Sequence, residues 1–214
     1  PFGRRASPPP GSATMAERLT GVILAGGVSR RMGQDKVFLP WGNSTLLEHV
    51  IDTLRPITDE LIVAVNDLRP FRHLEGVHVV ADLLPGAHAL GGLYTGLRAA
   101  SNDRCFVCGC DAPFLNPALI RFLAGQADGY DAVIPETHKG LQPLHAIYQK
   151  SALHAMEDQL RRRQWALVDL VGRLRANVVG ATVLHQRDPA GFSCLNVNTP
   201  EEYVKACELW KRDV

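Results

Sequence analysis

A short glycine-rich and cationic stretch, directly after an apolar run, constrains this chain more than any other feature. The run Leu19–Leu24 reads LTGVIL and predicts a buried β-strand, because it contains β-branched residues and is bounded by turn residues. The stretch Leu24–Lys36 then reads LAGGVSRRMGQDK. Its glycines carry no Cβ, so the backbone can turn sharply and approach a ligand closely. A strand followed by such a loop predicts an α/β fold with a ligand at the end of the strand.

The composition of the loop indicates that this ligand is an anion. Three glycines are combined with three cations within it: Gly26, Gly27, Gly33, Arg30, Arg31 and Lys36. Oriented backbone amides beside cationic side chains form a concave site for a phosphate chain. The spacing matches neither GxxxxGK[ST] nor GxGxxG. A bare glycine pair would favour a solvated loop, but three cations directly after the first strand favour phosphate binding, with Arg30 either on the phosphates or in solvent.

The stretch resembles the signature LAGGxxxRMGxDK of nucleotidyltransferases that activate a phosphorylated small molecule with a nucleoside triphosphate. It is most similar to the molybdenum cofactor guanylyltransferases of the MobA type. The resemblance implies that the loop wraps the triphosphate and guanine of GTP, through Leu24, Ala25, Gly26 and Gly27. It also implies that Lys36 and Arg31 neutralise charge that grows on the triphosphate during catalysis.

Composition limits the remaining possibilities. The 214 residues suit one domain, expected over residues 15–214, with residues 1–14 as a disordered arm or an added leader. A net charge of +1 gives no electrostatic case for nucleic acid or membrane binding, and no apolar run has the length of a membrane span. Five cysteines without a secretory signal indicate the cytoplasm. Cys105, Cys108 and Cys110 are expected as apolar fillers of a strand, with Cys105 on the opposite face from the other two.

Strands alternate with helices, which predicts a single Rossmann-like α/β domain with a mostly parallel sheet flanked by helices. Further strands are expected at 61–65, 77–81, 105–110, 131–134, 144–148 and 177–184, the first two of these covered on both faces and 144–148 antiparallel. Helices are expected at 46–54, 93–100, 117–124, 151–163, 165–174 and 200–211, with N-caps at Thr45, Asn116, Ser151 and Thr199. Residues 83–92 are expected to form a long turn.

Two aspartates follow predicted strands. Asp111 ends the cysteine strand in CDAP, where an aspartate before proline often only closes a turn. In the family that this chain resembles, the aspartate of the CDxP motif holds magnesium, which implies a Mg²⁺ site at Asp111. Asp82, in VVADLL, is similar to the strand-end aspartate that helps bind the nucleotide, and a turn-forming role is equally compatible. The family often continues with GPLAG or GPLGG; here the segment reads HALGG, so His88 and Ala89 replace the first two residues and Gly92 is kept.

The segment NVNTPEE supplies polar residues for the acceptor. Asn196 and Asn198 share one face of an extended chain, where two amides suit a pterin edge or a phosphate; alternatively they only form a turn before a helix. The segment resembles the family motif on the acceptor side of the cleft, as does Gln142-Pro143. His145 alone is expected to be structural. Asn66 lies near a base-binding asparagine of some relatives, but the matching register gives Ala64.

These observations together predict a magnesium-dependent nucleotidyltransferase. By resemblance, the phosphate of molybdopterin carrying molybdenum attacks the α-phosphate of GTP, giving the guanine dinucleotide and pyrophosphate. Transient contacts with cofactor-biosynthesis proteins or molybdoenzyme chaperones are implied. The alternatives are cytidylyl transfer from CTP, a non-catalytic nucleotide- or cofactor-binding module, and a sugar-phosphate nucleotidyltransferase. The main prediction requires Lys36 and Asp111 to lie on the same side of the molecule.

Overall fold

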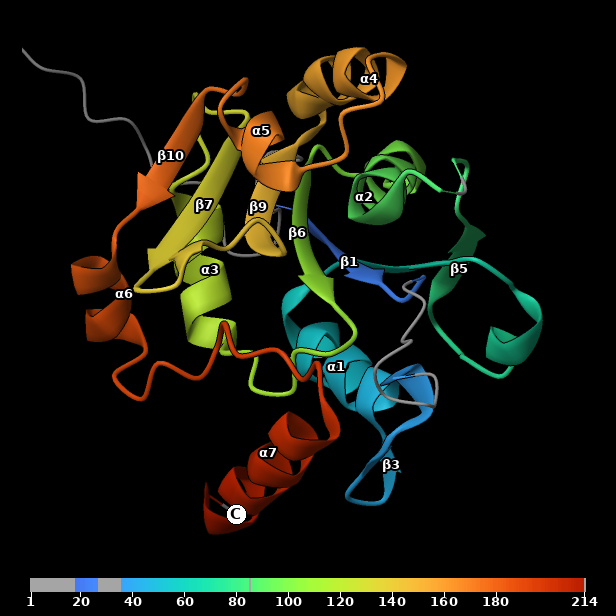
Figure 1. Ribbon diagram of the computed structural model, residues 1–214, viewed down its shortest axis with the longest axis vertical. Helices are drawn as coiled ribbons and strands as arrows, with labels where there is room; N and C mark the ends of the chain where they lie inside the picture. The colour runs from blue at the N-terminus through green and yellow to red at the C-terminus, as the bar shows by residue number, and fades with distance from the viewer. Residues whose placement is uncertain (1–17, 27–35, 85, 214) are drawn as a thin grey trace, which may run out of the picture.

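The computed structural model describes residues 18–26, 36–84 and 86–213 (Figure 1). Within these residues an eight-stranded sheet has the order β10-β7-β9-β6-β1-β4-β5, and β8 pairs with β7. The strands are β1 (Leu19–Leu24), β4 (Glu60–Val65), β5 (His78–Ala81), β6 (Arg104–Gly109), β7 (Ala132–Thr137), β8 (Gly140–Leu141), β9 (His145–Gln149) and β10 (Ala176–Val179). The short strands β2 (Pro40–Trp41) and β3 (Ser44–Thr45) form a separate antiparallel pair.

The sheet is parallel except at β9 and at the short strand β8, which runs antiparallel to β7. β1 pairs in parallel with β4 and β6, β4 with β5, and β7 with β10. β9 runs antiparallel to both β6 and β7, as predicted for residues 144–148. The carboxyl ends of β1, β4, β5 and β6 therefore meet at one edge, where α/β sheets bind their ligands. The predicted fold class is confirmed.

Helices cover both faces of the sheet (Figure 1). One face carries α1 (Leu46–Leu54), α3 (Pro117–Gly125) and α6 (Ala181–Arg187), whose apolar residues join one buried cluster. The other carries α2 (His88–Ala99), α4 (Leu153–Arg161) and α5 (Leu167–Val171), which join a second cluster. α7 (Pro200–Asp213) packs through Ala206 and Trp210 on the β2–β3 pair. Short 3₁₀ helices cover Lys36–Phe38, Arg55–Ile57, Arg69–Phe71 and Lys150–Ala152.

The strand of three cysteines has the predicted alternation. Cys105 belongs to the cluster under α2, whereas Cys108 and Cys110 belong to the cluster under α1 and α3. None of the five cysteines, all of which lie in the described residues, is part of a disulfide. Burial raises the pKa of the Cys105 thiol to about 12 and that of Cys108 well above its usual value, so both thiols stay protonated. They act as small apolar side chains.

The predicted helix starts are confirmed at three positions. Thr45 and Glu48 form a reciprocal capping box at α1, and the Asn116 side chain accepts from two backbone N–H groups of α3. Thr199 Oγ1 accepts from Glu202 N at 3.2 Å. Ser151 was wrongly expected to cap a helix: its hydroxyl donates instead to Asp131 Oδ1 at 2.7 Å, and α4 starts two residues later behind a 3₁₀ turn.

Four other element predictions were wrong. Residues 177–184 do not form one strand, because β10 ends at Val179 and α6 begins after the extended residue Gly180. β5 is not covered on both faces, because it is the edge strand and its side chains are exposed or half-buried. The turn 83–92 is shorter than expected, since α2 already begins at His88. The helix expected over 165–174 is reduced to α5.

Helix α2 packs on β1 through a glycine. A Cβ on Gly96 would lie 2.3 Å from Val22 Cγ1, a contact that requires the helix or strand to move. Gly96→Ala is expected to lower the free energy of unfolding by about 1–3 kcal/mol, even though alanine favours a helix by up to ~1 kcal/mol. Urea unfolding measures this. Gly125→Ala is the matched control, because no atom lies within 4 Å of that position, and its stability should stay equal or rise.

Candidate nucleotide and metal site

Backbone hydrogen bonds continue past the strand ends and bring three segments of the predicted site to one edge. Ala25 N donates to Ala64 O at 2.8 Å, and Cys110 N donates to Leu24 O at 3.1 Å. Asp82 N donates to Val65 O at 2.8 Å. Leu24 and Ala25 thus lie between the ends of β4 and β6. Gly27, Gly33, Arg30 and Arg31 lie outside the described residues, so their predicted roles stay predictions.

Lys36 and Asp111 form the centre of this edge. Lys36 Nζ lies 2.9 Å from Asp111 Oδ2 and 2.8 Å from Asn198 Oδ1. The two charged side chains are 15% and 19% exposed, so the ion pair is shielded from water but reachable from outside. Three segments far apart in sequence therefore converge on one ammonium group. The predicted proximity of Lys36 and Asp111 is confirmed, and Asn198 joins them.

The Asp111 side chain lies over Gly109, two residues earlier in the chain. A Cβ on Gly109 would lie 2.4 Å from Asp111 Oδ1, so the carboxylate folds over a position that only glycine leaves free. Val197 N donates to Asp111 O at 2.8 Å, which ties the segment before α7 to the turn after β6. Val197 is fully buried, and Asn196 and Asn198 on either side of it are half-buried and exposed. Of these two asparagines, only Asn198 has a side-chain bond to Lys36 in the described part of the chain.

Asp82 lies at the same edge but takes part in a turn. Its Oδ1 accepts from Thr95 Oγ1 and from Leu84 N, both at 3.0 Å. β5 is separated from β6 by β1 and β4, so Asp82 does not share the Lys36–Asp111 cluster. Asp82 is half-buried, which leaves its other oxygen near the start of α2. The turn-forming role is observed, and nucleotide binding by Asp82 stays a prediction.

Helix α2 begins within the segment HALGG, at His88. His88 has φ +54°, a left-handed conformation that glycine adopts without strain. The family pattern GPLGG has glycine at this position, which tolerates a left-handed conformation better than histidine does. Gly92 faces the first strand, and a Cβ there would lie 3.4 Å from Leu24 Cδ2. The contact supports a structural reason for Gly92 beside its predicted place in the nucleotide site.

Asn66 was not assigned a role from the sequence. It follows β4, and its Nδ2 donates to the carbonyl of Gly26. A Cβ on Gly26 would lie 2.9 Å from Asn66 Oδ1, so the two residues are in close contact. Within the sheet Leu24 pairs with Ala64, two residues before Asn66. The only sequence signal for Asn66 is a polar side chain directly after a buried strand. Its contact holds the first residue of the glycine loop.

Among the described residues, neither Gln142 nor His145 has a side-chain hydrogen bond to Lys36 or Asp111. Gln142 Nε2 donates to Thr137 Oγ1 and to Gly140 O, which closes the β7–β8 hairpin. His145 is 3% exposed, packs edge-on against Phe106 at 5.2 Å, and has no hydrogen-bond partner at either ring nitrogen among the described residues. The predicted structural role of His145 is consistent with this position.

Buried His145 predicts acid sensitivity. Burial lowers the pKa of its imidazole from 6.5 to about 4, opposed by the Asp188 carboxylate. Between these values the unfolded chain binds a proton that the folded chain does not. Above about pH 6.5 His145 therefore costs no stability, and its effect lowers the free energy of unfolding by about 3 kcal/mol as the pH drops to 4. His145→Leu should flatten the pH dependence of urea unfolding across this window, whereas the exposed His154→Leu should keep it.

The donor set for a metal is small. Among the described residues there is no group of three or more His, Cys, Asp or Glu side chains that could hold an ion. One carboxylate, Asp111, lies at the centre of the site. A Mg²⁺ ion held by one or two carboxylates, phosphate oxygens and waters needs no larger protein cage.

In the described ranges, no helix is both long and apolar enough to cross a bilayer.

Comparison with known proteins agrees with this geometry. Residues 21–178 match the family described as MobA-like NTP transferase domain. A probable molybdenum cofactor guanylyltransferase of Pelotomaculum thermopropionicum is 38% identical over 87% of this chain and 91% of its own. The molybdenum cofactor guanylyltransferase of Desulfosudis oleivorans is 34% identical over 89% and 95%. The crystal structure of molybdopterin-guanine dinucleotide biosynthesis protein A from Archaeoglobus fulgidus has a TM-score of 0.79 and 26% identity, covering 90% of this chain and 99% of the other.

The match spans most of the described sheet, from β1 to β10, and the relatives are covered almost entirely. Five residues of the motifs that resemble the family lie at this edge, namely Leu24, Ala25, Lys36, Asp111 and Asn198. The chain belongs to the family of MobA-like NTP transferases.

Proposed function

We propose that this protein transfers GMP from GTP to the terminal phosphate of molybdopterin carrying molybdenum, and releases pyrophosphate. The observation that carries the proposal is the contact of Lys36 Nζ with both Asp111 and Asn198. A cation, a carboxylate and an amide at one strand edge suit a reaction between two phosphate-bearing substrates. The relatives are named for guanylyl transfer to the molybdenum cofactor and for molybdopterin-guanine dinucleotide biosynthesis, which supports GTP as the nucleotide and molybdopterin as the acceptor.

The reaction needs alignment and charge stabilisation more than covalent help from the protein. An oxygen of the acceptor phosphate attacks the α-phosphate of GTP, and the bond to the β-phosphate breaks as pyrophosphate leaves. Lys36 donates hydrogen bonds to the triphosphate oxygens, where negative charge must be balanced. Asn198 positions the acceptor on the other side of Lys36. Leu24, Ala25, Gly26 and Gly27 lie along the nucleotide, and Asn196 faces the acceptor.

Mg²⁺ is the proposed cofactor, with Asp111 as its protein ligand. The Asp111 carboxylate lies over Gly109, where a side chain would collide with it, and it is partly exposed. Its exposed side is available to an ion brought by GTP. When bound, Mg²⁺ would neutralise phosphate charge and polarise the reacting phosphate. The protein groups would do the rest: Lys36 binds phosphate, and the Val197–Asp111 backbone bond keeps the acceptor segment next to the carboxylate.

The cytoplasm is the proposed location, because five cysteines without a disulfide among them suit a reducing compartment. Transient contacts with cofactor-biosynthesis proteins or molybdoenzyme chaperones are proposed from the fate of the product.

The direct test is incubation with molybdenum-loaded molybdopterin, Mg²⁺ and an equal mixture of GTP and CTP, followed by product analysis. Formation of the guanine dinucleotide with one pyrophosphate per turnover is expected. Preferential use of CTP would assign the protein to the cytidylyltransferases instead. Binding of GTP without any pyrophosphate release would make it a non-catalytic module.

A further inference from the structure

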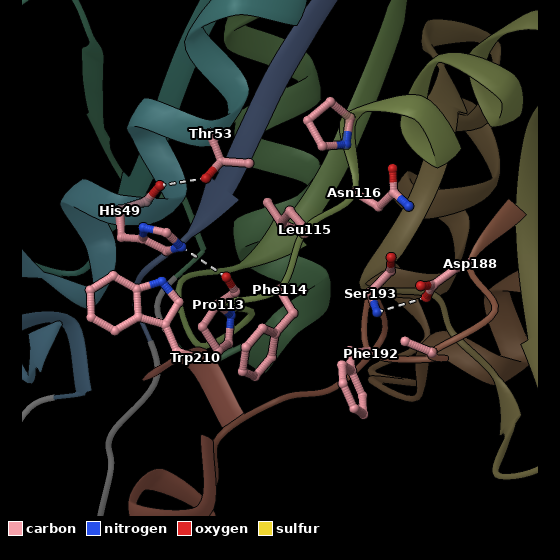
Figure 2. A pocket seen from close by; sticks show the side chains of 12 residues that line it. His49, Thr53, Pro113, Phe114, Leu115, Asn116, Asp188, Phe192, Ser193 and Trp210 are labelled. Atoms are coloured by element: carbon pink, nitrogen blue, oxygen red, sulfur yellow. Dashed lines mark hydrogen bonds between the residues drawn. The ribbon is translucent and has the colours of Figure 1, made fainter. Parts of the chain in front are cut away.

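A pocket lies beside the proposed site. It has a volume of about 380 Å³, within the range of small-ligand pockets. It lies between α1, the turn that leads from β6 to α3, the segment before α7 and α7 itself (Figure 2). Its lining includes His49, Phe114, Asp188, Phe192, Ser193 and Trp210. We call it the aromatic pocket.

The aromatic pocket has flat apolar walls. The rings of Phe114 and Phe192 have centroids 5.7 Å apart and are tilted by 46°, and Trp210 lies across from them, with its ring 6.5 Å from that of His49 (Figure 2). His49 Nε2 donates to Pro113 O at 2.9 Å, which fixes this side of the wall. Such walls favour a planar ring over a flexible polar chain.

Two polar groups at the other end of the aromatic pocket specify which ring fits. Ser193 is completely buried, and its Oγ has no hydrogen-bond partner in the described part of the chain. A buried hydroxyl without a partner is costly, so a ligand that bonds to it would relieve that cost. Asp188 accepts from Ser193 N through Oδ2 at 2.9 Å and is half-buried. A carboxylate has about four lone-pair positions, so Asp188 retains capacity for further N–H donors.

The aromatic pocket and the Lys36–Asp111 pair share two stretches of chain. Pro113 lines the pocket and follows Asp111 by two residues, a span of at most about 7 Å. The segment that carries Asp188 and Ser193 continues to Asn198, which accepts from Lys36. A ligand in the pocket that bears a phosphate would therefore extend towards the site on the side of Asn198.

We propose that the aromatic pocket binds the pterin ring of the acceptor. The aminopyrimidinone edge of a pterin carries adjacent N–H and NH₂ donors, which suit the Asp188 carboxylate, and its carbonyl oxygen or a ring nitrogen suits the Ser193 hydroxyl. Phe114 and Phe192, which pack on each other, form an apolar wall against which the ring lies. This inference rests on the proposed function for the identity of the acceptor, and adds the residues that recognise it.

The test uses 6-hydroxymethylpterin, a fluorescent pterin without phosphate or metal, titrated against the purified protein. Asp188→Asn keeps an oxygen for Ser193 N but loses the charge, and is expected to weaken binding by about tenfold or more. Ser193→Ala is expected to weaken it by about three- to tenfold, with the thermal midpoint of the free protein unchanged or raised, since the lost hydroxyl had no partner. The control Asp169→Asn changes an exposed residue of α5, on the other face of the sheet, and should bind as the parent does.

The outcomes separate this inference from the proposed function. If pterin binds and both pocket variants weaken it, the pocket assignment holds whether or not GMP is transferred. If the parent protein transfers GMP while Asp188→Asn and Ser193→Ala bind pterin as the parent does, the pocket assignment is overturned and the function stands. Absence of pterin binding by the parent also overturns it. In the transfer assay, Asp188→Asn should raise KM for molybdopterin and leave KM for GTP unchanged.

Discussion

Asp111→Asn is expected to slow pyrophosphate release by about 10²–10³-fold, the loss typical when one electrostatic group of a phosphoryl- or acyl-transfer site is removed. The change keeps the shape of the side chain and an oxygen that can accept from Lys36 Nζ, which now lies 2.9 Å from Oδ2. Only the charge that would hold Mg²⁺ is lost. Turnover should be measured by coupled pyrophosphate detection at saturating GTP and Mg²⁺.

The control for this variant is Asp169→Asn, which removes an equal charge from an exposed position of α5. Thermal unfolding of both variants should resemble that of the parent, which excludes loss of fold as the cause. Turnover of Asp111→Asn within a factor of two of the parent would remove Asp111 from the catalytic site and would leave the carboxylate as a turn residue before Pro113.

Lys36→Met is expected to change two affinities in opposite directions. GTP should bind about 10–100-fold more weakly, because each charge-assisted hydrogen bond to phosphate contributes about 1.5–3 kcal/mol. Mg²⁺ without nucleotide should bind more tightly, because Lys36 Nζ no longer competes for Asp111 Oδ2. Isothermal titration with GTP, and separately with MgCl₂ in a nucleotide-free buffer, measures both values. A merely structural lysine would not produce opposite changes.

Lys205→Met provides the matched control, since Lys205 is exposed on α7. Both affinities of that variant should equal those of the parent. If Lys36→Met weakened Mg²⁺ binding, Lys36 would be organising the metal site rather than occupying it, and the competition between the ammonium and the ion would be refuted.

The central pair of the site could be predicted because it depends on local order along the chain. Polar motifs that directly follow strands of a parallel sheet reach the same edge, which is why the stretch that ends in Lys36 was expected near Asp111. The place of the NVNTPEE segment beside them was implied only by the resemblance to the family. The capping residues Thr45 and Asn116 were also predictable, since a cap depends on neighbours within one helical turn.

Other features depend on contacts between distant residues. The apolar pattern of 177–184 does not reveal that Gly180 ends the strand and that Leu184 packs in a helix under the sheet. The position of β5 at the edge follows from strand order, which the sequence does not state. Asn66 and Ser193 gain their importance from Gly26 and from the aromatic pocket, and nothing adjacent to them in sequence marks either contact.

The bond between Lys36 and Asn198 joins residues that are 162 positions apart. A ribosome adds about 5–20 residues per second, so Asn198 is synthesised roughly 10–30 s after Lys36. The strands that flank the glycine loop are complete long before the segment that holds the acceptor exists. Under the proposed function, a growing chain would acquire its nucleotide-binding strand ends first, and would become able to use the nucleotide only when α7 begins to form.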